Sequence, residues 1–331
     1  MILNYNGERF LKSCLYALLA QELEGGFEIL VVDNASQDGS PGLVRREFPQ
    51  VRLIESRSNL GFAAGNNLGI SLARGRHVVL LNNDTEVRPG WLRALVAAAE
   101  SEPRCGAVAG NLLFKDRPGT VQNAGSLLLT DGSGADRGSG EDETGYRERG
   151  EVFGACGASV LLTRPMLADV GGLDPTFFMY YEDTDLSWRM RLRGWRVIFE
   201  PEARVLHVHA ATSVEWSPFF TFHVDRNRLF MILKNAPAGF VARSFLSFAV
   251  LSARNAARTL IGRVRRPPEG LQKANLGPGR ARIHLRVIAS LVGHGPEMLV
   301  KRIRIRSRRT VPDTEIERFM YPREAWDARF R

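Results

Sequence analysis

The chain has 331 residues, 44% of them hydrophobic and 24% charged, so it is long enough for one large α/β domain and a smaller appendage. Its three cysteines are widely spaced and form no Cys-x-x-Cys pair, which argues against a disulfide framework or a zinc site and favours a reducing compartment. No uncharged apolar run reaches the roughly 18 residues of a membrane span, and we expect no signal peptide.

The positive charge is concentrated in one region. The chain carries a net charge of +9, but residues 254–309 hold 15 Lys and Arg against two acidic residues, a net charge of +13. Residues 1–253 have a net charge of −3 and residues 310–331 of −1. The basic region therefore needs an explanation of its own.

Buried apolar segments alternate with amphipathic ones over the first third of the chain. Strands are predicted at 1–3, 27–32, 51–54 and 77–81, and helices at 9–21, 41–48, 59–75 and 89–100. This alternation implies right-handed crossovers and a mainly parallel sheet. Buried parallel strands usually have about five or six residues, so we expect either a shortened first strand or a start upstream of Met1.

Two of the predicted strands end abruptly in acidic and amide residues. One ends as Val-Val-Asp-Asn-Ala-Ser from Val31, and the other as Leu-Leu-Asn-Asn-Asp-Thr-Glu from Leu80. Ligands of open α/β sheets bind beyond the carboxyl ends of the strands, which predicts one shared cleft for both segments. The spacing of Gly61, Gly65 and Gly69 does not match the Gly-x-Gly-x-x-Gly pattern of a dinucleotide site.

The pattern changes after Ala107. Residues 115–150 are rich in Gly, Asp, Glu and Arg, which predicts a mobile loop over the site or a disordered segment. Residues 152–162 return to buried strand character, and the small side chains among them let a ligand approach the backbone closely. Short strands are predicted at 196–200 and 204–208.

Three carboxylates lie within four residues, at or just before a helix that runs to Gly194: Glu182, Asp183 and Asp185. Taken alone, they fit the capping of the helix and its dipole as well as they fit chemistry. Their occurrence after two polar strand ends favours a third part of the same cleft.

From Trp216 onward the chain is predicted to be helical, at 218–233 and 238–262. Pro267-Pro268 and residues 276–279 interrupt this pattern. Two further apolar segments are interleaved with arginine and stay open between helix and strand, at 287–291 and 298–305.

Five stretches together carry a resemblance to a known family. They are Asn4-Tyr5-Asn6-Gly7, the segment at Asp33, Asn59-Leu60-Gly61-Phe62-Ala63-Ala64-Gly65-Asn66-Asn67, the segment at Asp84, and Glu182-Asp183. In this order the chain resembles a family 2 glycosyltransferase of the GT-A fold, close to bacterial rhamnosyltransferase-type enzymes, over roughly residues 1–235. The resemblance implies a Rossmann-like, mainly parallel α/β catalytic domain at residues 1–215 and a helical, basic region at residues 216–331.

The resemblance also implies a reaction. Such enzymes move a sugar from a nucleotide-diphosphate donor to a hydroxyl group, here with inversion at the anomeric carbon. We expect dTDP-rhamnose or a UDP-sugar as the donor, and a cell-surface glycan or a lipid-linked molecule as the acceptor. The expected cofactor is a divalent metal ion, Mn²⁺ or Mg²⁺, that stabilises the departing diphosphate.

The expected metal ligands are the positions that match the family. Asp84 is the first, and His207, after a predicted strand, is the second. His209 lies two residues on, on the same face of the strand, and is a weaker candidate. Asn82 stands where the family usually has the first acid of Asp-x-Asp, and its amide oxygen can contact the ribose or a metal-bound water.

The resemblance assigns the catalytic base to Asp183, which takes the proton of the acceptor hydroxyl as the new bond forms. Glu182 and Asp185 are expected to orient the acceptor or to hold the end of the helix. The expected nucleotide contacts lie in the turns that follow the strands: Asn4, Asp33, Asn59, Gly65, Asn82 and Asn83.

Two other classes of protein stay open. A sugar-phosphate nucleotidyltransferase shares the fold and the metal, but it carries a Gly-rich phosphate loop with Arg or Lys after the first strand, which Asn4-Tyr5-Asn6-Gly7 does not supply. A non-catalytic nucleotide-sugar-binding module is the other, and the presence of both Asp84 and Asp183 argues against it.

The basic region fits a membrane surface better than nucleic acid. Apolar residues lie between its arginines, as in segments that lie in the membrane interface with arginines on anionic head groups. We therefore expect a cytoplasmic enzyme held peripherally at the inner face of the cell membrane. Binding of nucleic acid is the lesser expectation.

Overall fold

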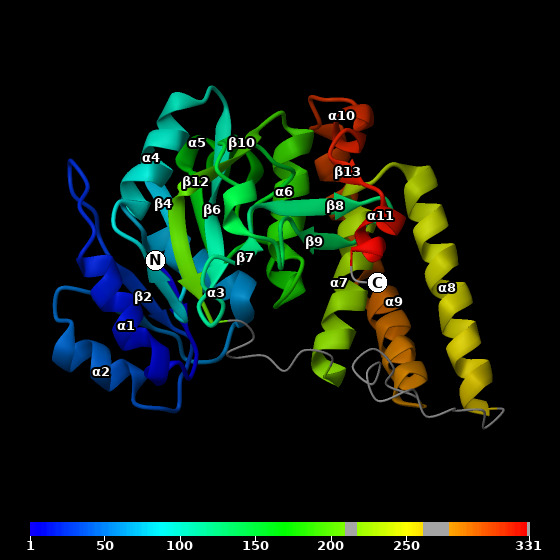
Figure 1. The fold of residues 1–331 in the computed structure, drawn as a ribbon. Helices are drawn as coiled ribbons and strands as arrows, with labels where there is room; N and C mark the ends of the chain where they lie inside the picture. The colour runs from blue at the N-terminus through cyan, green and yellow to red at the C-terminus, as the bar shows by residue number, and fades with distance from the viewer. Residues whose placement is uncertain (209–216, 261–277, 330–331) are drawn as a thin grey trace. The chain divides into compact units, whose positions relative to one another are not determined.

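The computed structural model describes residues 1–208, 217–260 and 278–329 (Figure 1). The chain divides into two compact units, which we call the first unit (Met1–Ala211 with Thr310–Arg331) and the second unit (Thr212–Arg309). The predicted boundary between residues 215 and 216 and the candidate ligand His209 lie outside the described residues.

A large mixed sheet forms the centre of the first unit. Its strands are β1 Ile2–Asn4, β2 Leu30–Asp33, β3 Arg52–Glu55, β4 His77–Asn82, β5 Thr85–Val87, β6 Cys105–Phe114, β7 Val121–Asn123, β10 Gly150–Glu151, β11 Ser159–Thr163 and β12 Arg196–His207. Their order is β10-β12-β6-β11-β4-β1-β2-β3, with β5 beside β12 and β7 beside β6. Strands β1 to β4 are parallel, as are β6 and β12. The predicted α/β class with a mainly parallel sheet is confirmed.

The topology brings three strand ends to one edge of the sheet. From β1 the chain passes through β2 and β3 on one side, and then crosses to β4 on the other side of β1. Ligands of doubly wound sheets bind at such a switch point, beyond the carboxyl ends of the strands. Asn4 ends β1, Asp33 ends β2 and Asn82 ends β4, so the polar turns seen in the sequence meet there.

Helices cover both faces of the sheet (Figure 1). One face packs against α1 (Glu8–Leu19), α2 (Ser40–Glu47) and α4 (Trp91–Ser101), and the other against α3 (Gly61–Leu72), α5 (Arg164–Val170) and α6 (Glu182–Leu192). Helix α1 illustrates why these segments are helical, since Leu11, Leu15 and Leu18 recur at helical spacing and are all buried. Burying each such side chain contributes about 1.5–3 kcal/mol.

Strand β6 is not predicted by the sequence pattern, although all ten of its residues are buried. Gly106, Gly110 and Asn111 interrupt its apolar run. Close packing explains one of these small residues, because a Cβ added at Gly110 would lie 2.6 Å from Oγ of Ser159 on β11. The two short strands predicted nearby are also corrected, since they form the single strand β12 with an irregularity in its middle.

The expectation of a loop or disorder at residues 115–150 is wrong. After β7 this segment forms β8 (Ser126–Leu129), β9 (Gly134–Asp136) and a 3₁₀ helix (Glu143–Gly145). Strands β8 and β9 join β13 (Met320–Tyr321) in a second sheet of order β13-β8-β9. Of the closely spaced glycines that suggested a loop, Gly134 begins β9, and Gly132, Gly138 and Gly140 adopt positive φ at turns.

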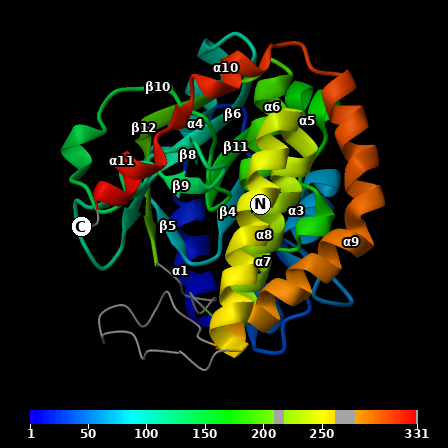
Figure 2. The same ribbon diagram turned by 90° about the vertical axis from the view of Figure 1, so that its right-hand side faces the viewer.

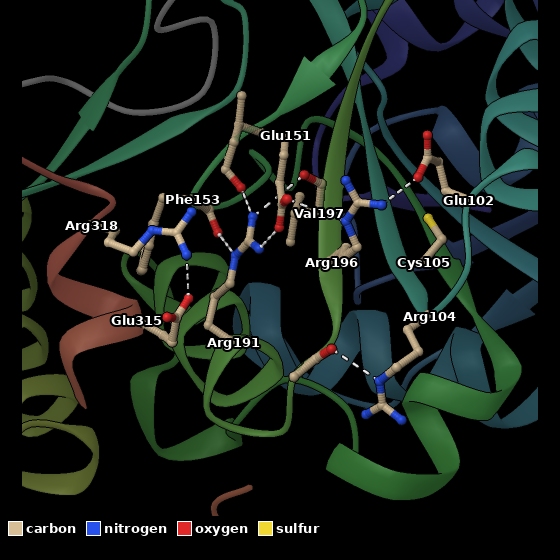
Figure 3. Close-up of polar contacts among 12 residues, drawn as sticks. Glu102, Arg104, Cys105, Glu151, Phe153, Arg191, Arg196, Val197, Glu315 and Arg318 are labelled. Atoms are coloured by element: carbon tan, nitrogen blue, oxygen red, sulfur yellow. Dashed lines mark hydrogen bonds and ion pairs between the residues drawn. The ribbon is translucent and has the colours of Figure 1, made fainter. Parts of the chain in front are cut away.

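Helix α6 is buried on almost every side, and the side chain of Arg191 therefore bonds inside the protein (Figure 3). Nε of Arg191 donates to the carbonyl oxygen of Phe153 (3.0 Å), and the same guanidinium pairs with Glu151. Glu151 also pairs with Arg196 at the start of β12 (3.2 Å). Gly194 (φ 72°) follows the end of the helix, as the sequence predicts. These contacts anchor the C-terminal end of α6 to the sheet.

The described part of the second unit is helical, with α7 (Pro218–Asn235), α8 (Ala238–Leu260) and α9 (Pro278–Ser307). The predicted helices at 218–233 and 238–262 are confirmed as far as the structure describes them. Both apolar segments that stayed open lie in α9. The chain then returns to the first unit with α10 (Asp313–Glu317), β13 and α11 (Arg323–Ala328). No helix in the described ranges has the length and apolar character needed to cross a membrane.

Candidate functional site

Polar side chains at the ends of β1, β2 and β4 form one hydrogen-bonded group, which we call the strand-end cluster: Asn4, Asp33, Ser36 and Asn83. Nδ2 of Asn4 donates to Oδ1 of Asp33 (3.1 Å) and to Oγ of Ser36 (3.2 Å). Nδ2 of Asn83 donates to Oδ1 of Asn4 (2.7 Å). Asn4, Asp33 and Asn83 are 0%, 3% and 6% exposed. Mutual hydrogen bonds hold these side chains in one orientation, as a binding edge requires.

Two predicted nucleotide contacts support this edge. Oδ1 of Asn59 accepts from Nδ2 of Asn34 (3.0 Å) and from the N–H of Gly61 (2.9 Å), which closes the turn before α3. Gly65 lies on α3 against β1, where an added Cβ would stand 2.5 Å from Cδ1 of Leu3. Gly65 thus lets the helix pack closely on the central strand.

Asp84 and His207 meet where β5 pairs with β12. Oδ1 of Asp84 is buried and lies 3.1 Å from Nε2 of His207, yet it accepts no hydrogen bond from the described residues. On the other side of the ring, Nδ1 of His207 lies 2.8 Å from Oε1 of Gln122 on β7. The tautomer with its proton on Nδ1 donates to Gln122 and leaves the Nε2 lone pair facing Asp84.

These two side chains fit a divalent cation. A buried carboxylate oxygen without a hydrogen-bond donor and a neighbouring imidazole lone pair are both donor types that Mn²⁺ accepts. A cation that is also bound by substrate phosphates needs only one or two protein ligands. Among the described residues, no group of three or more His, Cys, Asp or Glu side chains is arranged to hold a metal. The remaining ligands would therefore have to come from substrate and water.

The carboxylates at the start of α6 lie inside its first turn rather than at the N-cap. Tyr181 is the N-cap residue and its side chain makes no capping hydrogen bond, whereas Asp183 bonds to the first-turn N–H of Thr184. Oδ2 of Asp183 accepts from the N–H of Gly157 (3.1 Å), and its Oδ1 accepts from the N–H (2.6 Å) and Oγ1 (3.1 Å) of Thr184. Asp183 is therefore held in one orientation from both sides.

Burial changes the acidity of these groups. It raises the pKa of Asp183 above the ordinary value, while hydrogen bonds from Gly157 and Thr184 partly oppose that shift. Burial also raises the pKa of Glu182 well above its ordinary value, and the negative charges of Asp183 and Asp185 add to the effect. A carboxylate with a raised pKa is the stronger base, so this part of the site is suited to accept a proton.

Asp185 differs from Asp183 and Glu182 because it forms an ion pair within α6. Its side chain is fully buried, and its Oδ2 lies 2.9 Å from Nε of Arg189, one turn further along α6. Arg189 also donates to the carbonyl oxygens of Val170 (3.1 Å) and Gly172 (2.7 Å). Asp185 therefore helps to hold α6 against the loop that follows α5.

The backbone before α6 is strained. Phe178, Tyr180 and Tyr181 have φ values of 63°, 70° and 68°, a region that costs a non-glycine residue about 1–3 kcal/mol. The carbonyl oxygen of Phe178 accepts from the N–H groups of Phe62 (2.6 Å) and Ala63 (3.2 Å) at the start of α3. Helix α3 thus holds the loop in a conformation of the kind that clusters at functional sites.

The turn at Gly157 and Ala158 forms hydrogen bonds with both the end of β4 and the start of α6. The carbonyl oxygen of Ala158 accepts from the N–H of Asn82 (3.0 Å), and the N–H of Gly157 donates to Asp183 (3.1 Å). The side chain of Asn82 is only half-buried. A Cβ added at Gly157 would lie 3.0 Å from the ring of Phe62, so this turn is tightly enclosed.

Gln122 and Thr184 are missed by the sequence analysis. Gln122 lies in the segment expected to be a loop, and no local pattern marks it as a partner of His207. Thr184 lies inside the acidic stretch, where a hydroxyl directly after Asp183 is a signal that could have found it.

A separate cavity of about 360 Å³ lies at the other end of the sheet, beside Met1, Phe27 and His77 among other residues. It is found where β1 and β4 begin rather than where they end. It is therefore distinct from the strand ends at which ligands of such sheets bind.

The sequence of this chain is similar to those of known glycosyltransferases. A sequence model described as "Glycosyl transferase family 2" matches residues 1–171, just over half of the chain. N-acetylglucosaminyl-diphospho-decaprenol L-rhamnosyltransferase of Mycobacterium tuberculosis is 30% identical over 259 residues, which cover 70% of this chain and 81% of that protein. O-antigen biosynthesis protein RfbC of Myxococcus xanthus is 30% identical over 212 residues, which cover 61% of this chain and 16% of that protein.

Two solved structures share the fold. GalNAc-T7, with UDP, GalNAc and Mn²⁺, superposes with a TM-score of 0.59 at 14% identity, over 88% of this chain and 56% of that one. Mannosyltransferase PcManGT from Pyrobaculum calidifontis, in complex with GDP-Man and Mn²⁺, gives 0.53 at 18% identity, over 88% and 84%. This chain spans little more than half of GalNAc-T7, and at these identities the likeness concerns the fold alone.

Proposed function

This chain belongs to glycosyltransferase family 2, and from that premise we propose that it transfers a sugar from a nucleotide-diphosphate sugar to a hydroxyl group with inversion at the anomeric carbon. One observation carries the proposal. A pair of metal-type ligands, Asp84 with His207, and a carboxylate of raised pKa, Asp183, lie in one unit at the strand ends and at the turn that joins them.

The donor end of the proposed site has two parts. The strand-end cluster offers oriented amide and carboxylate groups for the base and ribose, with Asp33 as the central acceptor. Asp84 and His207 would hold a divalent cation, and Gln122 would orient the histidine from behind. When bound, such a cation neutralises negative charge that develops on the departing diphosphate.

The acceptor end is proposed to use Asp183 as the general base. A carboxylate cannot ionise a sugar hydroxyl in advance, but it can take the proton while the new bond forms. Its hydrogen bonds with Gly157 and Thr184 fix its direction, and burial makes it a stronger base than a solvated aspartate. A single base opposite the leaving group implies one displacement, and hence inversion. Glu182 stands beside it with Oε2 buried and without a hydrogen-bond partner among the described residues, as a group that could orient the acceptor.

Rhamnose is the proposed sugar, carried by dTDP, with a UDP-sugar as the next candidate. The name of the Mycobacterium tuberculosis relative supports an L-rhamnosyl group and a lipid-diphosphate-linked acceptor. RfbC supports a surface polysaccharide as the setting. We extend both points to this chain as a cell-surface glycan or lipid-linked acceptor.

The test compares Asp84→Ala with Asp116→Ala, whose side chain is 79% exposed and serves as the matched control. Nucleotide at about 100 times its Kd should stabilise the wild type by about 2.7 kcal/mol in the presence of Mn²⁺. Asp84→Ala should lose the Mn²⁺-dependent part of this gain and all transfer, whereas Asp116→Ala should keep both. Gln122→Ala should weaken Mn²⁺ binding by about 10–100-fold.

Turnover of a panel of nucleotide sugars identifies the donor, and the anomeric configuration of the product reports the mechanism. Metal-dependent turnover by Asp84→Ala would refute the metal assignment. A retained configuration would refute the single displacement. Nucleotide binding without turnover of any donor would instead favour a binding module.

A further inference from the structure

Helix α9 has an apolar face that packs inside the second unit. Ile283 and Val287 are buried against Leu229 of α7 and Phe248 of α8, and Leu291 packs on the same cluster. Residues four apart recur along this face, which is the usual pattern of a helix with one buried side. A helix of this kind normally carries polar residues on its opposite side.

The opposite side of α9 is apolar as well. We call it the outer stripe: Leu285, Ile288, Val292, Leu299 and Ile303, which are 67%, 40%, 74%, 49% and 69% exposed. Their spacings of three, four, seven and four residues keep them on one side of a helix. Single exposed apolar residues are ordinary, but a continuous exposed stripe marks an interaction surface.

Helix α8 repeats the arrangement. Phe248 faces the shared core, whereas Leu246 and Val250 are 66% and 43% exposed on the other side, with the small residues Ala249 and Ala253 beside them. Helices α8 and α9 pack against each other (Figure 2). The second unit therefore presents apolar outer faces on two neighbouring helices.

Five of the six arginines of α9 fall into two sets. Arg302 and Arg306 point inward and donate to carbonyl oxygens at the C-terminal end of α7, including those of Leu233 (2.7 Å) and Asn235 (3.0 Å). A second set is exposed, namely Arg282, Arg286 and Arg304, of which Arg286 also lies over the ring of Phe222 on α7 (5.0 Å). The first set stabilises the unit, and the second leaves positive charge beside exposed apolar side chains.

We propose that the outer stripe of α9, with the exposed face of α8, docks the protein on a bilayer that contains anionic lipid. Apolar side chains would enter the head-group boundary while the flanking arginines contact lipid phosphates. Charge complementarity favours an anionic lipid surface as the partner. Helix α9 has one acidic residue, Glu297, and its charge is already paired with Lys301 (2.6 Å). The 30 residues of α9 bend along their length (Figure 2), with Pro296 in the interior, so the helix lies on a surface rather than through it.

This inference does not rest on the proposed sugar transfer, and its test needs neither donor nor acceptor. The full chain is sedimented with vesicles of phosphatidylcholine alone or with about a third phosphatidylglycerol, at about 0.01 M and about 1 M salt. We expect binding to the anionic vesicles that weakens as salt rises. Equal binding to both kinds of vesicle, or to neither, would overturn the proposal.

Two triple variants locate the surface. Arg282→Gln/Arg286→Gln/Arg304→Gln should weaken partitioning on the order of 100-fold, since three basic residues contribute about 1 kcal/mol each. The control replaces three exposed arginines of the first unit by Gln, at Arg46, Arg93 and Arg147, and should bind like the wild type. Equal losses in both triples would mean that net charge alone, and not this helix, attracts the protein.

Val292→Ser/Leu299→Ser/Ile303→Ser tests the apolar part and should weaken partitioning about tenfold or more, even at high salt. Its control, Tyr16→Ser/Phe27→Ser, changes exposed apolar side chains of the first unit and should leave binding unchanged. Light scattering of the wild type tests the competing occupant of the stripe, which is a second copy of this chain. A dimer that the α9 variant converts to a monomer would show that the stripe binds a second copy, and would overturn the proposal.

Discussion

The strand-end cluster and the start of α6 differ in whether their buried polar atoms have hydrogen-bond partners. In the cluster, Asn4 bonds to Asp33, Ser36 and Asn83, so its amide is satisfied before any ligand arrives. At the start of α6, Oε2 of Glu182 is buried without a hydrogen-bond partner among the described residues. Native proteins leave few such atoms, because each costs about 1–3 kcal/mol. We propose that the first region binds the donor and that the second supplies the chemistry.

Helix α6 contains both arrangements within one turn. Asp185 is paired with Arg189 and serves the packing of the helix, whereas Asp183 accepts hydrogen bonds from Gly157 on one oxygen and from Thr184 on the other. Strained backbone at Tyr180 and Tyr181 precedes them. The three carboxylates of this stretch therefore differ in their hydrogen-bond partners, a difference that their sequence does not show.

The largest expected effect comes from Asp183→Asn. If Asp183 is the base, kcat should fall about 10²–10⁴-fold while donor affinity stays nearly unchanged, because a base acts mainly in the transition state. Steady-state kinetics with donor titration measures both quantities. Loss of donor affinity with retained kcat would assign Asp183 to structure, and would remove the contrast with the strand-end cluster.

The pH profile sharpens this test. The pKa of Asp183 is raised by burial, so the acidic limb of kcat/KM should lie above the ordinary aspartate value of about 3.9. Thr184→Val removes the hydroxyl that bonds to Oδ1 (3.1 Å) and favours the ionised form, so the limb should move to still higher pH with little change in the plateau rate. An unmoved limb in this variant would mean that another group is titrating.

The next effect is expected in the strand-end cluster. Asn83→Ala removes the donor that lies 2.7 Å from Oδ1 of Asn4 and leaves a buried acceptor unpaired. We expect a loss of about 1–3 kcal/mol in the free energy of unfolding, and a higher KM for the donor with nearly unchanged kcat. Gln50→Ala, at an exposed turn, is the control. A fall in kcat at constant KM would place this region in the chemistry, against the comparison.

Sequence patterns locate the parts of this site that depend on local structure. The polar ends of β1 and β2 and the turn after β4 predict Asn4, Asp33 and Asp84 as site residues, because a strand fixes where the side chains at its end emerge. Gln122 could not be found in this way, since its contact with His207 arises from two strands that are 85 positions apart in the chain. Likewise, β13 pairs with β8 although Met320 and Leu128 are distant in sequence. Such contacts depend on the tertiary pairing of strands, which the local hydrophobic periodicity of the sequence does not reveal.

The smallest expected effect concerns Glu182, whose replacement is expected to increase the stability of the protein. Burial raises the pKa of Glu182 well above its ordinary value, so the folded protein favours the protonated form. The side chain therefore contributes most to stability below its unfolded pKa of about 4.3, and that contribution is lost as pH rises through the folded pKa. Glu182→Gln imitates the neutral form and should raise the free energy of unfolding at pH 7 by about 0.5–2 kcal/mol, but not at pH 4.

Melting temperatures of the wild type, Glu182→Gln and the exposed control Glu148→Gln, measured from pH 4 to pH 8, check this difference. The wild-type curve should approach that of Glu182→Gln at acid pH and fall below it near neutrality, whereas the control should follow the wild type throughout. Parallel curves for all three proteins would mean that Glu182 is as well solvated or paired as an ordinary surface carboxylate. The start of α6 would then be no less satisfied than the strand-end cluster, because leaving Oε2 of Glu182 unpaired would cost no stability that removal of its charge could recover.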